Sequence, residues 1–225
     1  RDFLLLQELE QKKIVLIGAR ANTRGVFHGP LWTYINYPAY LIGHGNPVSI
    51  AWFWIILEII FLATTYIILS KLFKPLTALI GTSLFSINLI PQINTLFGQQ
   101  ATFFFMPFFL YTIYSYLKSK KARYLGLHML TTGILIQMNI GAGMLFAILS
   151  LLLTAFFITR HKLWRHLFAL IFLPLAISNF ILFDIRHDFN ITKALLDLSS
   201  SSKFIIPLNQ WLINRFDNLI YMQLY

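Results

Sequence analysis

The sequence has no cysteine and few charged residues, most of them basic. The absence of cysteine excludes a disulfide framework, a Cys-ligated zinc site and a cysteine nucleophile. Only 12% of the residues are charged, whereas soluble domains carry about 25%. By contrast, 57% of the residues are hydrophobic and the mean hydropathy is +0.68. This composition predicts an integral membrane protein.

Acidic residues are absent from three short hydrophilic gaps between long apolar blocks. The gaps Lys71–Lys74, Lys118–Arg123 and Arg160–Arg165 hold nine of the eighteen Lys and Arg residues. Loops rich in Lys and Arg beside membrane spans stay cytoplasmic, and acids contribute little to that choice. We therefore predict that these gaps lie inside. Every other loop then lies outside, together with seven of the eight acids, Glu58 being the exception.

The net charge of +10 would suggest nucleic acid if the basic residues formed one face of a soluble domain. Here half of them lie in the predicted cytoplasmic gaps, where Lys and Arg anchor spans. We expect membrane lipids as partners and no nucleic acid.

The predicted fold class is all-α: a polytopic integral membrane protein with about six transmembrane helices and interfacial helices in its first extracytoplasmic loop. Three regions are expected. Residues 1–46 form that loop, with surface helices over Asp2–Lys12 and Pro30–Ile42. Residues 47–183 form the six-span region, and residues 184–225 form a second extracytoplasmic segment.

The six predicted spans are apolar blocks, and several of them are near the minimum of about 17 residues needed to cross a bilayer. They are Pro47–Ser70, Leu76–Gln92, Ala101–Leu117, Tyr124–Ile140, Gly141–Thr159 and Leu167–Phe183. The fourth and fifth are joined by barely a turn at Asn139.

Two outer regions hold residues that could carry chemistry. In the first loop, Asp2 could serve as a general base, and Arg24 and His28 could neutralise a phosphate. In the second, Arg186 and His187 follow the last span and could hold a lipid-linked phosphate at headgroup depth. The alternatives are a solvated loop with interfacial anchors, and a stop-transfer charge cluster with local Asp–Arg pairing.

A few polar residues lie within or near the spans. An acid at mid-span, such as Glu58, is a functional candidate, or else a structural hydrogen-bonding group. Gln137 and Asn139 could line a polar cavity under the outer loops, or make packing hydrogen bonds. His128 is expected at the cytoplasmic interface, as are His161 and His166. No spacing of His residues indicates a metal site, and the metal ligands are unknown.

Three motifs resemble one known family. They are Gly25–Tyr34, Gly43–Pro47 and the segment Phe183–Phe189. In order, spacing and membrane side they resemble membrane glycosyltransferases of the GT-C type. The closest likeness is the bacterial branch related to dolichyl-phosphate-mannose protein mannosyltransferases and lipid A aminoarabinose transferases.

The resemblance implies an enzyme of the cytoplasmic membrane whose active side is extracytoplasmic. Such an enzyme moves a sugar, with inversion, from a polyprenyl-phosphate donor to a lipid, glycan or protein acceptor. The one cofactor that the resemblance allows is a divalent cation. Donor phosphate binding is assigned to Arg24, His28, Arg186 and His187, and the substrate cavity to Tyr34, Gln137 and Asn139.

The family also has a hallmark acid in its first outer loop, close to an arginine. Arg1 resembles that family arginine, which places the catalytic base upstream of Arg1 and leaves Asp2 as the fallback. We therefore expect the chain to be a fragment that is inactive alone. The alternative function is a non-enzymatic transporter or lipid flippase, in which Glu58, Gln137 and Asn139 would be the important residues.

Overall fold

The computed structural model describes residues 2–21, 25–93 and 101–200, which form helices and one isolated β-bridge. Side chains are described except at residues 2, 88–93 and 198–200. The helices, in order, are α1 (Asp2–Lys12), α2 (Leu31–Ile42), α3 (Pro47–Leu72), α4 (Pro75–Ile93), α5 (Thr102–Ser119), α6 (Ala122–Met138), α7 (Ile140–His161), the 3₁₀ helix η1 (Trp164–Ile171), α8 (Phe172–Ala176), α9 (Ser178–Arg186) and α10 (Asn190–Ser200). The all-α prediction is confirmed for this part of the chain.

The two helices predicted in the first loop are both present, as α1 and α2. Leu6 and Leu9 lie on the buried face of α1, as their spacing predicts. Glu10, although exposed, accepts a hydrogen bond of 3.0 Å from the Tyr40 hydroxyl. Pro30 directly precedes α2 as its N-cap, where a missing N–H removes no helical hydrogen bond. The position of these helices at a membrane surface stays a prediction.

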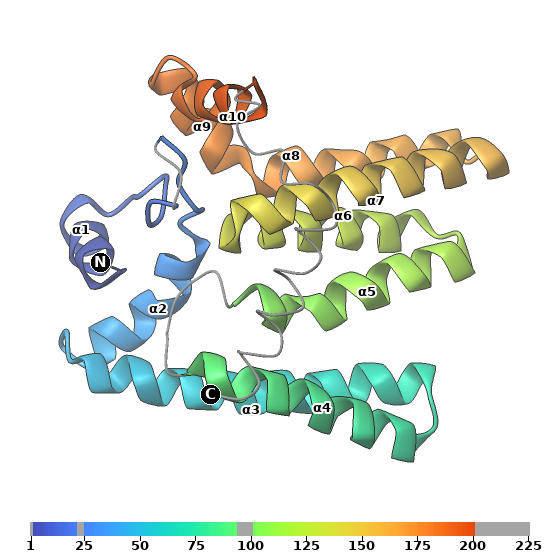
Figure 1. Ribbon diagram of the computed structural model, residues 1–225, viewed down its shortest axis with the longest axis horizontal. Helices are drawn as coiled ribbons and strands as arrows, with labels where there is room; N and C mark the ends of the chain where they lie inside the picture. The colour runs from blue at the N-terminus through green and yellow to red at the C-terminus, as the bar shows by residue number, and fades with distance from the viewer. Residues whose placement is uncertain (1, 22–24, 94–100, 201–225) are drawn as a thin grey trace.

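Helix α6 lies at the centre of the fold, in contact with α5, α7, η1 and α8 (Figure 1). Asn139 ends α6, and its side chain caps α7 by accepting a hydrogen bond of 3.3 Å from the Ala142 N–H. The two helices pack closely because Gly143 lies against the backbone of Ile136, leaving no room for a Cβ atom. The predicted turn of minimal length is therefore correct.

Two helices are long and apolar enough to cross a membrane, α3 and α7, within the part of the chain that the structure describes. A third crossing results if the bent pair Trp164–Ala176 and Ser178–Arg186 counts as one span. Helix α6 has 17 residues and α5 has 18. In α4, which has 19 residues, the residues with described side chains form the apolar stretch Pro75–Ile87. The structure thus supports two to three candidate spans.

The sixth predicted span, Leu167–Phe183, is not one straight helix. It consists of η1, α8 and the first part of α9, with a bend of 57° between α8 and α9. Pro174 lies in α8 and cannot donate to the carbonyl four residues earlier. The preceding segment, Trp164–Ile171, is a 3₁₀ helix rather than an α-helix.

The prediction that His128 is interfacial was wrong, because its side chain is fully buried between α5, α6 and α7. Its Nε2 lies 3.0 Å from Ser150 Oγ and its Nδ1 lies 3.3 Å from Thr112 Oγ1. The ring of Phe109 covers it at a centroid distance of 4.6 Å. The imidazole therefore joins three helices.

The three basic gaps gather at one end of the helices, where α3 turns into α4, α5 into α6 and α7 into η1 (Figure 1). The first-loop helices α1 and α2, together with α9 and α10, lie toward the opposite end. This separation agrees with the predicted grouping of basic and acidic loops, while the membrane side of each end stays a prediction.

Candidate functional site

The first loop folds back onto the turn between α6 and α7. A β-bridge pairs Arg20 with Phe27, and the N–H of Gly18 donates to the His28 carbonyl at 2.8 Å. The N–H of Gly29 then donates to the Gln137 carbonyl at 2.7 Å. These backbone bonds fix the end of the loop on α6.

His28 points into the protein, and its side chain is only 8% exposed. The Ile140 N–H at the start of α7 points to its Nδ1 at 3.5 Å. Burial lowers the pKa of the imidazole, because a charged ring loses more solvation than a neutral one. At neutral pH His28 can therefore contribute a hydrogen bond, but no positive charge.

The second outer segment begins at the end of α9, where Asp184 is buried. Its carboxylate accepts hydrogen bonds of 2.8 Å from the Ile191 N–H, and of 3.1 and 2.6 Å from the N–H and hydroxyl of Thr192. These are N-capping bonds to the first turn of α10. Asp184 makes no salt bridge to Arg186 within the described residues, so local Asp–Arg pairing does not explain this segment.

The first loop and the second outer segment meet, although about 150 residues separate them. Phe27 contacts Phe183 at a ring-centroid distance of 6.0 Å. His187 in turn stacks on Phe183 at 4.0 Å and 17°, and its Nδ1 lies 2.8 Å from the Phe183 carbonyl. Beneath these rings, Val26 packs in one buried cluster with Phe180 and Ile191.

Arg186 and His187 are exposed at this junction, and Arg186 makes no hydrogen bond or ion pair with any other described residue. The structure thus brings His28, Arg186 and His187 to one end of the molecule. Arg24 lies outside the described residues, as does the side chain of Asp2.

The three predicted cavity residues bind the backbone. The Tyr34 hydroxyl bonds to both the N–H and the carbonyl of Val15, at 3.0 and 3.1 Å. The Gln137 amide donates to the Ala176 carbonyl at 2.6 Å, and Asn139 caps α7. Their role in a substrate cavity stays a prediction. In the part of the chain that the structure describes, no three His, Cys, Asp or Glu residues are grouped to hold a metal ion.

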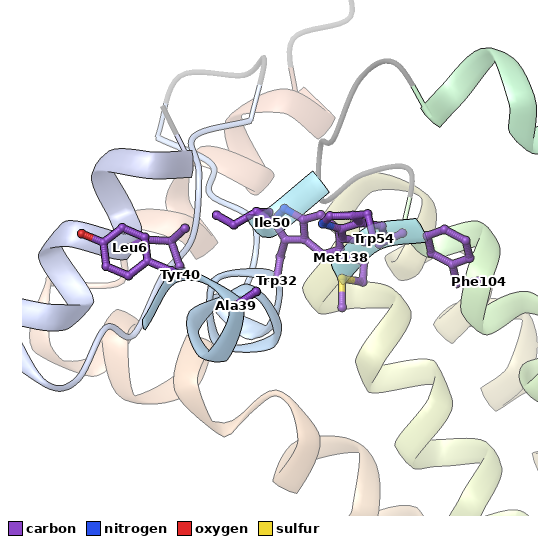
Figure 2. Close-up of a cluster of buried hydrophobic side chains, with 9 residues drawn as sticks. Leu6, Trp32, Ala39, Tyr40, Ile50, Trp54, Phe104 and Met138 are labelled. Atoms are coloured by element: carbon purple, nitrogen blue, oxygen red, sulfur yellow. The ribbon is translucent and has the colours of Figure 1, made fainter. Parts of the chain in front are cut away.

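A cavity of about 160 Å³ lies nearby, between α1, α2 and the start of α3. Its walls include Phe3, Leu6, Trp32, Ile50 and Trp54, with Asn36 and Thr33 as polar groups. Figure 2 shows Trp32, Ile50 and Trp54 grouped beside Met138 of α6. The Trp54 indole donates to Asn36 Oδ1 at 2.8 Å, which holds α2 against α3.

Sequence reasoning missed this cavity and the capping role of Asp184. The capping role has no local signal, because Asp184 lies inside α9 and not directly before α10, where an N-cap residue is expected. The cavity has no such signal either, because it depends on how α1 and α3 each pack against α2. No family model, curated protein or solved structure matches the chain.

Proposed function

We propose that this chain belongs to a GT-C type glycosyltransferase that uses a polyprenyl-phosphate sugar as donor. The acceptor would be a lipid, glycan or protein on the extracytoplasmic face of the cytoplasmic membrane. The observation that carries the proposal is the meeting of the two motif-bearing segments, through Phe27 and Phe183. These segments carry the family resemblance, and a shared site requires them to be adjacent.

In this mechanism a carboxylate deprotonates the acceptor, which attacks the anomeric carbon with inversion while the polyprenyl phosphate leaves. The departing phosphate needs positive charge beside it. The exposed Arg186 can supply this charge, and buried His28, neutral at pH 7, can supply a hydrogen bond. His187 is exposed beside Arg186, and the apolar cavity of Trp32 and Trp54 suits an isoprenoid chain.

We also propose that the six apolar segments form a six-span region. The three basic turns lie at the same end of the helices. The chain must therefore run along the molecule an even number of times between one basic turn and the next, which supports this topology. Cysteine labelling can test this topology, because the chain has no native cysteine. In intact cells an impermeant maleimide should label Gln11→Cys and spare Lys121→Cys, both of which are exposed positions. The reverse labelling pattern would refute the proposed orientation.

Donor binding tests the function without requiring turnover. Purified chain in detergent should bind undecaprenyl phosphate more tightly than undecaprenol, which lacks only the phosphate. Arg186→Gln should weaken phosphate-lipid binding about tenfold, the effect of losing one charge-assisted hydrogen bond, and leave undecaprenol binding unchanged. Lys193→Gln, at an exposed position on α10, is the matched control. Equal affinity for the two lipids would refute the proposal.

A transporter or flippase is the second candidate, and one observation favours it. Glu58 lies midway along α3 and makes no hydrogen bond or ion pair with the other described residues. An acid at that depth is a candidate for ion or proton coupling. Lipid or solute movement in proteoliposomes that is abolished by Glu58→Gln, without donor-lipid binding, would support this candidate over the transferase.

A further inference from the structure

The three basic turns form one exposed surface, which we call the basic end. It consists of Lys71, Lys74, Lys118, Lys120, Lys121, Arg123, Arg160, Lys162 and Arg165, all of them exposed. The one salt bridge among the described residues joins Lys12 to Glu8 in α1, toward the other end of the molecule (Figure 1). The acidic residues in the described part of the chain therefore do not neutralise the basic end.

The turn between α5 and α6 contacts the end of α7 through one lysine and one histidine. Lys120 Nζ lies 3.2 Å from His161 Nδ1, and the His161 ring packs on Phe157 at 4.5 Å. When Lys120 donates to Nδ1, the ring proton lies on Nε2. The pair then presents only N–H donors to its surroundings. Lys162 adjoins it and ends α7 in a left-handed conformation with φ of 55°.

The contacts that other basic residues make here leave their charges in place. Lys118 Nζ donates to the Tyr114 hydroxyl at 3.3 Å, and the Arg123 guanidinium lies over the Tyr124 ring at 5.0 Å. An aromatic ring attracts a cation but does not neutralise it. The basic end therefore keeps a large positive potential and favours a ligand with several anionic oxygens.

Exposed apolar side chains beside the cations indicate where that ligand comes from. Trp164 and Phe168 are 58% and 84% exposed on either side of Arg165, and Phe73 is 56% exposed next to Lys74. Aromatic and basic side chains mixed at the ends of apolar helices are typical of the headgroup layer of a bilayer. A free anion in water would not require the aromatic neighbours.

We propose that the basic end, centred on Lys120 and His161, binds the phosphodiester headgroups of anionic membrane phospholipids. Clusters of Lys and Arg next to membrane helices bind such lipids through charge. The inference goes beyond the glycosyltransferase proposal and depends only on membrane insertion of the chain. It would hold equally for a transporter.

The experiment measures lipid retained by the purified full chain. Chain in maltoside micelles is mixed with dioleoyl-phosphatidylglycerol and dioleoyl-phosphatidylcholine, washed, and its bound lipid is counted by mass spectrometry. Phosphatidylglycerol should exceed phosphatidylcholine about tenfold. This preference should fall steeply between about 50 and about 500 mM NaCl, because salt screens exposed charges. Inorganic phosphate should not displace the bound lipid.

Three variants locate the site. Combined Lys120→Gln, Lys162→Gln and Arg165→Gln should abolish the preference. Combined Lys120→Arg and Lys162→Arg, which keep both charges, should retain it. The matched control removes equal charge far from the basic end, with Lys12→Gln, Lys13→Gln and Lys193→Gln.

Each contrary outcome overturns the proposal. If the control variant lost the preference for phosphatidylglycerol as fully as the triple variant, the effect would be one of overall charge. Displacement of the bound lipid by inorganic phosphate would show a site for free anions. A salt-independent preference in the unmodified chain would exclude electrostatic binding even if the triple variant failed to fold. Equal affinity for undecaprenyl phosphate and undecaprenol in the donor-binding experiment would leave this result unaffected, so the two proposals can fail separately.

Discussion

Ser150→Ala tests how the buried imidazole of His128 joins the helices. The Thr112 hydroxyl lies 2.8 Å from the Phe108 carbonyl, to which it donates. Its oxygen can then accept from His128 Nδ1 at 3.3 Å. This arrangement puts the ring proton on Nδ1 and leaves Nε2 to accept from the Ser150 hydroxyl at 3.0 Å. Ser150→Ala would therefore leave a buried acceptor without its donor.

We expect Ser150→Ala to lower the free energy of unfolding by about 1 to 2 kcal/mol. An unsatisfied buried acceptor costs about 1 to 3 kcal/mol in water-soluble proteins, and interhelical bonds in membranes contribute toward the lower end of that range. The measurement is unfolding in mixed micelles titrated with denaturing detergent. Thr159→Val is the control, because that exposed hydroxyl bonds only to carbonyls within α7.

A double-mutant cycle with His128→Leu isolates the pair. If the bond is as described, Ser150→Ala should cost far less once His128 is absent, giving a coupling of about 0.5 to 1.5 kcal/mol. Additive effects, together with a Ser150→Ala cost no larger than that of Thr159→Val, would refute the reasoning.

Three further perturbations have expected outcomes. Burial lowers the pKa of His28, so as pH falls the unfolded chain takes up the proton before the folded chain does. The free energy of unfolding should therefore decrease as pH falls below about 6.5. His28→Gln should show a smaller decrease over the same pH range, and identical pH profiles for the two proteins would contradict the buried, neutral ring. Asp184→Ala should destabilise α10 by about 1 kcal/mol through loss of its cap, seen as faster amide exchange at Ile191 and Thr192, while Asp188→Ala, at an exposed position, should leave that exchange unchanged. Gly143→Ala places a Cβ atom against the Ile136 backbone and should cost about 1 to 3 kcal/mol, whereas Gly141→Ala, whose Cβ would meet only Asn139 Oδ1 at 3.7 Å, should be much milder in the same unfolding assay.

Local signals in the sequence predict most of the helices. The helix at Asp2–Lys12 follows from the spacing of Leu6 and Leu9, and α2 from Pro30 at its start. The polar residue Asn139 also separates α6 from α7, where its side-chain cap begins the second helix. These features depend on neighbours within a few residues, which a single sequence displays directly.

Features set by packing between distant helices were predicted poorly. His128 follows the basic gap that ends at Arg123, and this closeness in sequence suggests an interfacial position. Helices α5 and α7 nevertheless cover its side chain completely. The bend between α8 and α9 was missed although Pro174 is visible in the sequence, because proline allows a helix to continue when neighbours satisfy the freed groups. Which groups do so depends on the fold.

Gln137 of the candidate site has features that its local sequence predicts and contacts that depend on the packing of distant segments. Its sequence position next to Asn139 predicts a place beneath the outer loops, and hydrogen bonding in packing was one of its two predicted roles. Its backbone carbonyl accepts from Gly29 of the first loop. Its amide donates to the Ala176 carbonyl, where α8 ends at the bend. Since the first loop and the bent segment lead to His28 and Arg186 respectively, one residue of α6 ties together the two outer segments on which the proposed donor site depends.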